Sequence, residues 1–187
     1  MYDNVLINLS RTGDSAMNSK ILFFIRLVDS MTDWIGKLAS LMLIPMCLLL
    51  VLEIIMRYLL NNPTIFAHES SIFLYGGIGM FGGAYTYLYK GHVSLDIIYG
   101  KLPARRKAIL DIITSPLFFL FCIVLIWQGW DMGYVSLMMD EHSPSPWGPP
   151  LYPLKLIIPV ATVVLMLQGV VKLIRDVYTV VTGKELS

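Results

Sequence analysis

Four long apolar stretches, separated by polar connections, constrain this chain more than any other feature of its sequence. Each reaches the roughly 20 residues that a helix needs to cross the roughly 30 Å of hydrocarbon in a bilayer; they cover residues 34–60, 65–89, 108–130 and 151–174. The composition agrees, because 56% of the residues are hydrophobic and 14% are charged, against about a quarter charged in soluble domains. A backbone in lipid must satisfy its own hydrogen bonds, and no strand-like alternation is visible. We therefore predict an all-α membrane protein with four transmembrane helices.

The distribution of Lys and Arg predicts the orientation of these helices. All 14 of these residues except Arg57 and Lys155 fall before or early in the first stretch, between the second and third, or near the C-terminus. Because cytoplasmic flanks carry the excess of cations, both termini and the connection of residues 90–107 are expected in the cytoplasm. The cations stay at membrane flanks, which argues against binding of nucleic acid.

An amphipathic pattern precedes the first span. Apolar residues recur there at helical spacing, while polar residues such as Asp29 and Asp33 lie largely off that stripe; the apolar ones are Ile21, Phe24, Ile25, Val28, Met31 and Ile35. No small-residue cleavage site is present, so the pattern does not indicate a cleavable signal. We predict a helix in the cytoplasmic interface, with an early start of the first span as the alternative. The predicted organisation is a mobile segment (1–18), an interfacial helix (19–33), a four-helix membrane domain (34–176) and a cytoplasmic tail (177–187).

Four polar residues within or beside the apolar stretches are candidate structural or subunit-interface residues. Glu53 and Arg57 are four positions apart, a spacing that favours an ion pair over a proton relay. Glu69 begins the second helix, where the helix dipole favours a carboxylate and a capping role is expected. Gln168 lies in the fourth span, where hydrogen bonding to another helix is favoured over binding of a substrate.

The second span contains the glycine-rich run "GGIGMFGGAY". Gly79 and Gly83 form a GxxxG pair, whose missing side chains let another helix approach closely. We predict that this face packs against a helix of this chain or of a partner.

The connection after the second span contains His92 and Asp96, four positions apart. Two ligands are too few to predict a metal site, and the three histidines lie at or beyond the span boundaries rather than deep in the bundle, where haem ligation needs them. We interpret His92 and Asp96 as parts of a fixed elbow between the second and third helices. No motif for catalysis or for phosphate binding is present, so neither a cofactor nor enzymatic activity is expected.

Four segments, in this order, resemble a known family: "EIIMRYLLNNP" from Glu53, "HESS" from His68, "GGAYTYLYKGHVSLDII" from Gly82 and "PLYPLKLIIPVATVVLMLQG" from Pro150. Between about Ala39 and Arg175 the chain is similar to the DctQ-like small membrane subunit, the Q subunit, of tripartite ATP-independent periplasmic (TRAP) transporters.

The resemblance implies a scaffold role in a bacterial or archaeal inner membrane. In such systems a periplasmic binding protein (the P subunit) delivers an organic anion to a large membrane subunit (the M subunit), which imports it with sodium. The resemblance implies that the small subunit contacts the large subunit and membrane lipids. It also implies a role in docking the binding protein, for which the outer loop with Asp140 and Glu141 is the candidate. The substrate, a carboxylate, sugar acid or sulfonate, would bind in another chain.

Two other classes stay open at this point. An independent small oligomeric transporter or channel needs polar residues that face a shared pore, for which Gln168 is the single candidate. A membrane-anchored redox or enzymatic subunit is disfavoured by the positions of the histidines.

Overall fold

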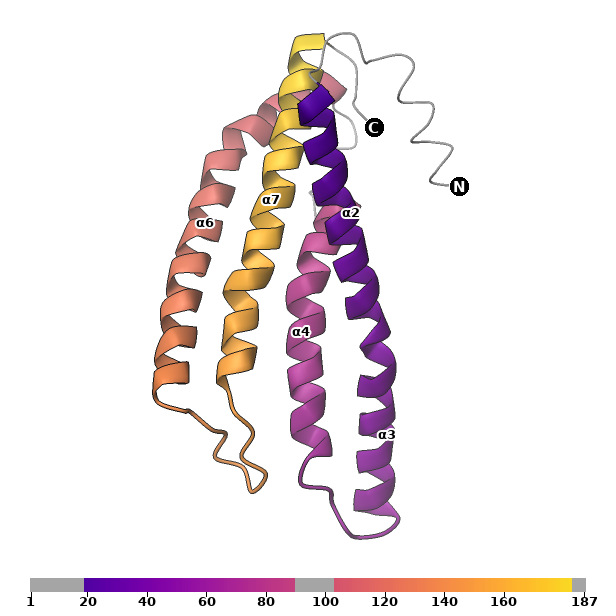
Figure 1. Cartoon of the computed structure of the whole chain (residues 1–187). Helices are drawn as coiled ribbons and strands as arrows, with labels where there is room; N and C mark the ends of the chain where they lie inside the picture. The colour runs from indigo at the N-terminus through magenta and orange to yellow at the C-terminus, as the bar shows by residue number, and fades with distance from the viewer. Residues whose placement is uncertain (1–18, 90–102, 183–187) are drawn as a thin grey trace.

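The computed structural model describes residues 19–89 and 103–182, and these ranges are helical apart from connections and one isolated bridge between His142 and Pro150. The helices lie side by side along one bundle (Figure 1). They are α2 (Ser19–Leu41), α3 (Leu43–Tyr58), α4 (Ala67–Leu88), α6 (Ala104–Met138) and α7 (Tyr152–Thr182). The predicted all-helical class is confirmed. The predicted mobile segment, residues 1–18, and the last five residues of the predicted tail lie outside the described ranges.

The first two helices follow one another with a single interruption at Met42. Its backbone stays near helical geometry, at φ −64° and ψ −15°, and the hydrogen bond from Met42 N to Leu38 O continues the ladder at 3.1 Å. Pro45 explains the interruption, because it has no N–H to donate to Leu41 O. The predicted boundary between residues 33 and 34 is therefore not a break: α2 passes through it. This agrees with the alternative of an early start, and the location of α2 at the cytoplasmic interface stays a prediction.

Three helical stretches in the described part of the chain are long and apolar enough to cross a membrane; they are Ser19–Tyr58, Arg105–Met138 and Tyr152–Thr182. The fourth predicted span, α4, has 22 residues, about 33 Å at 1.5 Å per residue, but its glycines and tyrosines make it less apolar. The described residues thus contain three to four helices that could span a membrane.

The helices α6 and α7 are longer than the apolar stretches that predicted them. The third span was expected to end at residue 130, but α6 continues to Met138, and α7 continues to Thr182 through the predicted start of the tail at residue 177. Pro159 does not break α7, as predicted. Apolar composition identifies the part of a helix that lies in lipid, whereas the helix itself can continue into water.

The packing leaves most apolar side chains on the outside. A small core joins Ile25 and Val28 of α2 to Val171 of α7, all at most 5% exposed, whereas Leu117 and Trp127 of α6 are more than 70% exposed. In a membrane protein this outer surface is available to lipid and to other subunits.

Glycines let the helices approach at positions other than the predicted ones. A Cβ on Gly36 of α2 would lie 1.9 Å from Cδ2 of Tyr85 on α4, and one on Gly133 of α6 would lie 2.6 Å from Cδ2 of Leu156 on α7. A Cβ added to Gly79 or Gly83 would have no neighbouring atom within 4 Å. Of the two partners expected for the GxxxG pair, a helix of the described bundle does not contact it, and contact with a partner subunit stays a prediction.

We expect Gly36→Ala to destabilise the chain, because three side-chain atoms of Tyr85 would have to move to admit the new methyl group. Overpacking of this kind costs about 1–3 kcal/mol, and thermal unfolding in detergent, followed by tryptophan fluorescence, measures it. Gly83→Ala is the matched control and should unfold no earlier than the wild type. Equal unfolding temperatures for the two variants would contradict the packing of α2 on α4.

Candidate functional site

A buried amide links α7 to α2. Gln168 is only 2% exposed. Its Nε2 lies 2.9 Å from Thr32 Oγ1 and 3.2 Å from Asp29 Oδ1. The hydroxyl of Thr32 in turn donates to Val28 O at 2.9 Å. The structure thus places Gln168 as a donor between two helices, the role that was favoured over substrate binding.

Asp29 extends this contact to a second residue of α7. Its Oδ2 lies 2.5 Å from Nη2 of Arg175, so the same carboxylate accepts from an amide and from a guanidinium. The sequence pattern placed Asp29 off the apolar stripe, on a face expected to be polar. The structure shows that this face meets α7, and the spacing of Gln168 and Arg175 by seven residues, two helical turns, was the signal that could have paired them.

Asp33 makes the equivalent connection between α2 and α4. Its Oδ1 accepts a hydrogen bond from the hydroxyl of Tyr89 at 2.7 Å, and its Oδ2 lies 2.5 Å from Nζ of Lys37. Together Asp29 and Asp33 attach two successive turns of α2 to two different helices.

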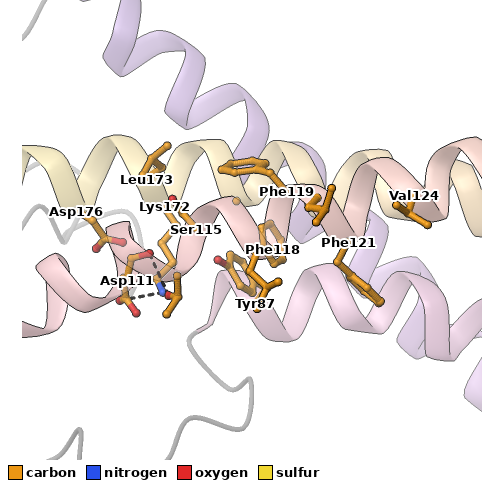
Figure 2. Close-up of a pocket in the computed structure, with 14 residues that line it drawn as sticks. Tyr87, Asp111, Ser115, Phe118, Phe119, Phe121, Val124, Lys172, Leu173 and Asp176 are labelled. Carbon is orange, nitrogen blue, oxygen red and sulfur yellow. Dashed lines mark hydrogen bonds and ion pairs between the residues drawn. The ribbon is translucent and has the colours of Figure 1, made fainter.

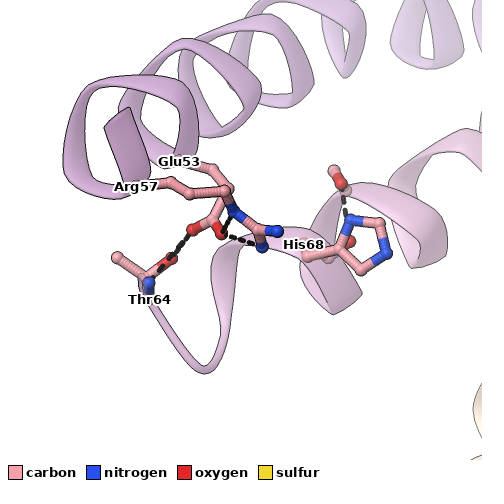
Figure 3. Close-up of polar contacts among 5 residues, drawn as sticks. Glu53, Arg57, Thr64 and His68 are labelled. Atoms are coloured by element: carbon pink, nitrogen blue, oxygen red, sulfur yellow. Dashed lines mark hydrogen bonds and ion pairs between the residues drawn. The ribbon is translucent and has the colours of Figure 1, made fainter. Parts of the chain in front are cut away.

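Both oxygens of the Glu53 carboxylate accept hydrogen bonds from residues of the same chain (Figure 3). Glu53 is 6% exposed; Oε1 accepts from Nη2 and Nε of Arg57 at 2.6 and 3.1 Å, and Oε2 accepts from the backbone N–H of Thr64 at 3.1 Å and from its hydroxyl. The i,i+4 ion pair was predicted, and Thr64, which attaches the end of α3 to the connection before α4, was not.

Glu69 links the start of α4 to the connection between α6 and α7. It lies in the first turn of α4, whose N-cap residue Phe66 makes no side-chain capping bond. The hydroxyl of Ser145, in the connection between α6 and α7, donates to Glu69 Oε2, and the same oxygen of Ser145 accepts from Gly148 N at 3.1 Å. Glu69 keeps the first-turn position where the helix dipole favours a carboxylate, and it also links segments 76 positions apart.

The acidic loop between α6 and α7 has an ordered backbone. Leu151 N donates to Glu141 O, and Ser143 N to Pro149 O, both at 2.9 Å. The carboxylate of Glu141 pairs with the ammonium of Lys155, which holds the pKa of Glu141 below its usual value. Asp140 has a left-handed backbone, φ 46°, and is exposed. Of the two docking candidates, Glu141 is thus engaged within the chain, and Asp140 faces outward.

His92 and Asp96 lie outside the described residues, so the predicted elbow stays a prediction. In the part of the chain that is described, no group of three or more His, Cys, Asp or Glu side chains could hold a metal ion. Cys47 and Cys122 are both free thiols.

These contacts share one chemical character. The described carboxylates of Asp29, Glu53, Glu69 and Glu141 each accept hydrogen bonds from a different segment or turn of the same chain. Such an arrangement positions helices and loops. Glu53 and Gln168, the two most buried of the predicted residues, both bond to other residues of this chain.

Residues 46–179 match the family model described as "Tripartite ATP-independent periplasmic transporters, DctQ component". The chain is 26% identical over 108 residues to a protein of Haemophilus influenzae assigned as a TRAP transporter small permease, covering 56% of this chain and 67% of that protein. It is 26% identical over 86 residues to the C4-dicarboxylate TRAP transporter small permease protein DctQ of Vibrio cholerae, covering 46% of this chain and 37% of that protein. The chain therefore spans about two thirds of the first relative and little more than a third of the second.

We expect Gln168→Leu to lower the free energy of unfolding by about 1–2 kcal/mol, because Asp29 and Thr32 lose a donor in a buried position. Thermal unfolding of the full chain in detergent measures the change. The matched control is Gln128→Leu on α6, where the glutamine is exposed and the substitution should be neutral. A wild-type unfolding temperature for Gln168→Leu would show that the buried amide does not hold α2 to α7.

Proposed function

This chain belongs to the DctQ family of TRAP transporter components, and we propose that it is the stationary scaffold on which the large membrane subunit works during sodium-coupled import of an organic anion. It is a small permease subunit and a multi-pass membrane protein of a bacterial TRAP transporter, a transport protein and not an enzyme. Membership of a tripartite system implies partner subunits.

One observation carries the scaffold role. Two buried polar side chains that could serve a transport pathway are instead occupied by bonds that hold this chain together: Gln168 bonds to α2, and Glu53 bonds to Arg57 and Thr64. Side chains in a transport site must exchange partners with the substrate or with ions. The large subunit, rather than this chain, is accordingly proposed to bind substrate and sodium.

The outward face of α4 is proposed to contact the large subunit. Gly79 and Gly83 have no side chains, and no other helix of the described bundle comes within 4 Å of a Cβ added at either position. The GxxxG spacing suits close contact with a helix. The large subunit is the helical membrane partner that a tripartite system requires.

The orientation with both termini in the cytoplasm is supported by two features. The start of α2, the end of α7 and the start of α6 lie at the same end of the bundle (Figure 1). Arg105 and Arg106 in the first turn of α6 and Arg175 near the end of α7 place cations at that end, as the positive-inside rule requires of the cytoplasmic side. The connections that carry Thr64 and Asp140 would then face the periplasm.

We expect this chain, reconstituted alone in proteoliposomes, to take up no substrate. Uptake should appear when the large subunit, the binding protein and an inward sodium gradient are all present. A radiolabelled C4-dicarboxylate, the class named for the Vibrio relative, is the first substrate to test, followed by sugar acids and sulfonates. Sodium-driven uptake of any of these by the chain alone would contradict the scaffold role.

The same assay tests the outer loop. If Asp140 contributes to docking, Asp140→Asn should raise the binding-protein concentration needed for half-maximal uptake and leave the maximal rate unchanged. Asp131→Asn, which removes the charge of an exposed acid on α6, is the control. An equal loss of rate at every binding-protein concentration would place the effect of Asp140 outside docking.

A further inference from the structure

The helix α2 has a second apolar side, which the described bundle leaves uncovered. Its buried residues Ile25, Val28 and Thr32 face α7. Other apolar side chains recur every three or four positions on the side turned away from α7, and they are 39–69% exposed; they are Phe23, Leu27, Met31, Trp34, Leu38 and Leu41. We call this set the outer stripe. Of its six residues, only Met31 belongs to the stripe that the sequence predicted.

One end of the outer stripe lies beyond the lipid. Charged side chains are costly in hydrocarbon, so ion pairs mark the level at which the helices leave it. Asp33 pairs with Lys37, whose side chain is 64% exposed, and Lys172 of α7 pairs with Asp111 of α6 at 2.9 Å, as Figure 2 shows. Phe23 is ten positions before Asp33, about 15 Å farther along the helix. The head-group layer on each side of a bilayer is about 5–8 Å thick, so Phe23 extends past it.

The contacts of α2 prevent it from lying flat on the membrane surface. Helices that bind a lipid surface lie in the plane of the interface. Here Gln168 and Arg175 of α7 hold Thr32 and Asp29 of α2, and α2 runs along the bundle in the direction that α3 continues (Figure 1). The outer stripe therefore passes from the membrane into water, where a contiguous exposed apolar surface marks a site of protein contact.

The two ends of the stripe indicate the chemistry of its partner. Leu38 and Leu41 continue the stripe into the spanning part of the helix, where an apolar surface fits. Lys20 is exposed and precedes Phe23 by three positions, and the salt bridges among the described residues do not include it. An acidic side chain of the partner would complement Lys20 beyond the lipid.

We propose that the outer stripe packs against a helix of the large membrane subunit that runs alongside α2 from the membrane into the cytoplasm. That helix is apolar along most of the contact and acidic opposite Lys20. Side chains spaced by three or four positions form the ridge that packs into the groove of a neighbouring helix. The inference rests on the proposed function, which supplies the partner subunit, and it adds a contact surface separate from the glycines of α4.

Maleimide labelling of single cysteines tests the proposal, in nanodiscs of phosphatidylethanolamine and phosphatidylglycerol and with Cys47 and Cys122 replaced. Leu27→Cys lies in the outer stripe; Arg26→Cys, one position away and also exposed, is the matched control on another side of α2. In the chain alone both should react at similar rates. In the complex with the large subunit, Leu27→Cys should react at least about tenfold more slowly, because a covered thiol reacts only through local opening. Arg26→Cys should be unchanged.

Two results would overturn the proposal. Slow labelling of Leu27→Cys in nanodiscs that lack the large subunit would show that lipid covers the stripe. An equal rate for Leu27→Cys with and without the large subunit would show that this subunit does not cover it.

A double variant separates the contact from folding. Phe23 and Leu27 are exposed in the chain alone, so Phe23→Gln with Leu27→Gln should leave its unfolding temperature unchanged. Affinity for the large subunit should fall at least about tenfold, because burial of one large apolar side chain is worth that factor. Val177→Gln with Val181→Gln, at exposed positions of α7 near the same end, is the control and should bind normally. Wild-type affinity of the α2 variant would contradict the contact.

Uptake of an organic anion by the full complex is measured separately, so that the two proposals can fail independently. Protection of Leu27→Cys in a complex that transports nothing would support this contact and contradict only the proposed function. Full-rate labelling of Leu27→Cys in a complex that transports would contradict only the contact.

Discussion

The hydrogen bond from the amide of Gln168 to α2 is the interaction on which the rest of the arrangement depends. It lies in the bundle interior, where water cannot replace a lost partner, so separation of α2 from α7 would leave Thr32 and Asp29 without their donor. With α2 held on α7, Asp33 reaches Tyr89 and Gly36 accepts the ring of Tyr85. The helix α4 is therefore positioned through α2, and α3 follows because it continues the direction of α2 (Figure 1).

The periplasmic end proposed for this bundle is secured by bonds of a different kind. At that end Glu53 attaches the connection before α4 through Thr64, Glu69 attaches the connection after α6 through Ser145, and Glu141 attaches that same connection to Lys155 of α7. Each bond joins a carboxylate to a loop or helix start. A subunit whose loops are fixed in this way can present a constant surface to a binding protein and a constant wall to a moving neighbour.

The spacing of residues along the sequence predicted interactions within a single helix. It did not predict contacts between segments that are distant in the sequence. The ion pair of Glu53 and Arg57 follows from their i,i+4 spacing on one helix, and the helices themselves follow from apolar length. Thr64 and Ser145 could not be found as partners, because only the folded connections bring them to Glu53 and Glu69. The small-residue pattern identified α4 as a helix capable of close contact, but it could not say that Gly36 and Gly133 would be covered and Gly79 would not, since glycine spacing carries no information about the facing helix. The helices α6 and α7 continue past residues 130 and 177, which hydropathy could not indicate because it reports contact with lipid rather than the end of a hydrogen-bond ladder.

The distance between α3 and α6 tests directly whether the chain is a stationary scaffold. Spin labels at Tyr58→Cys on α3 and Trp127→Cys on α6, two positions that are more than 75% exposed, report the separation of the two sides of the bundle after Cys47 and Cys122 have been replaced. The complex with the large subunit would be measured by double electron–electron resonance, with sodium alone and then with binding protein and substrate added. A stationary scaffold predicts the same distance distribution in both states. A shift of the main peak by several ångströms on addition of substrate would show that this chain moves with the transport cycle.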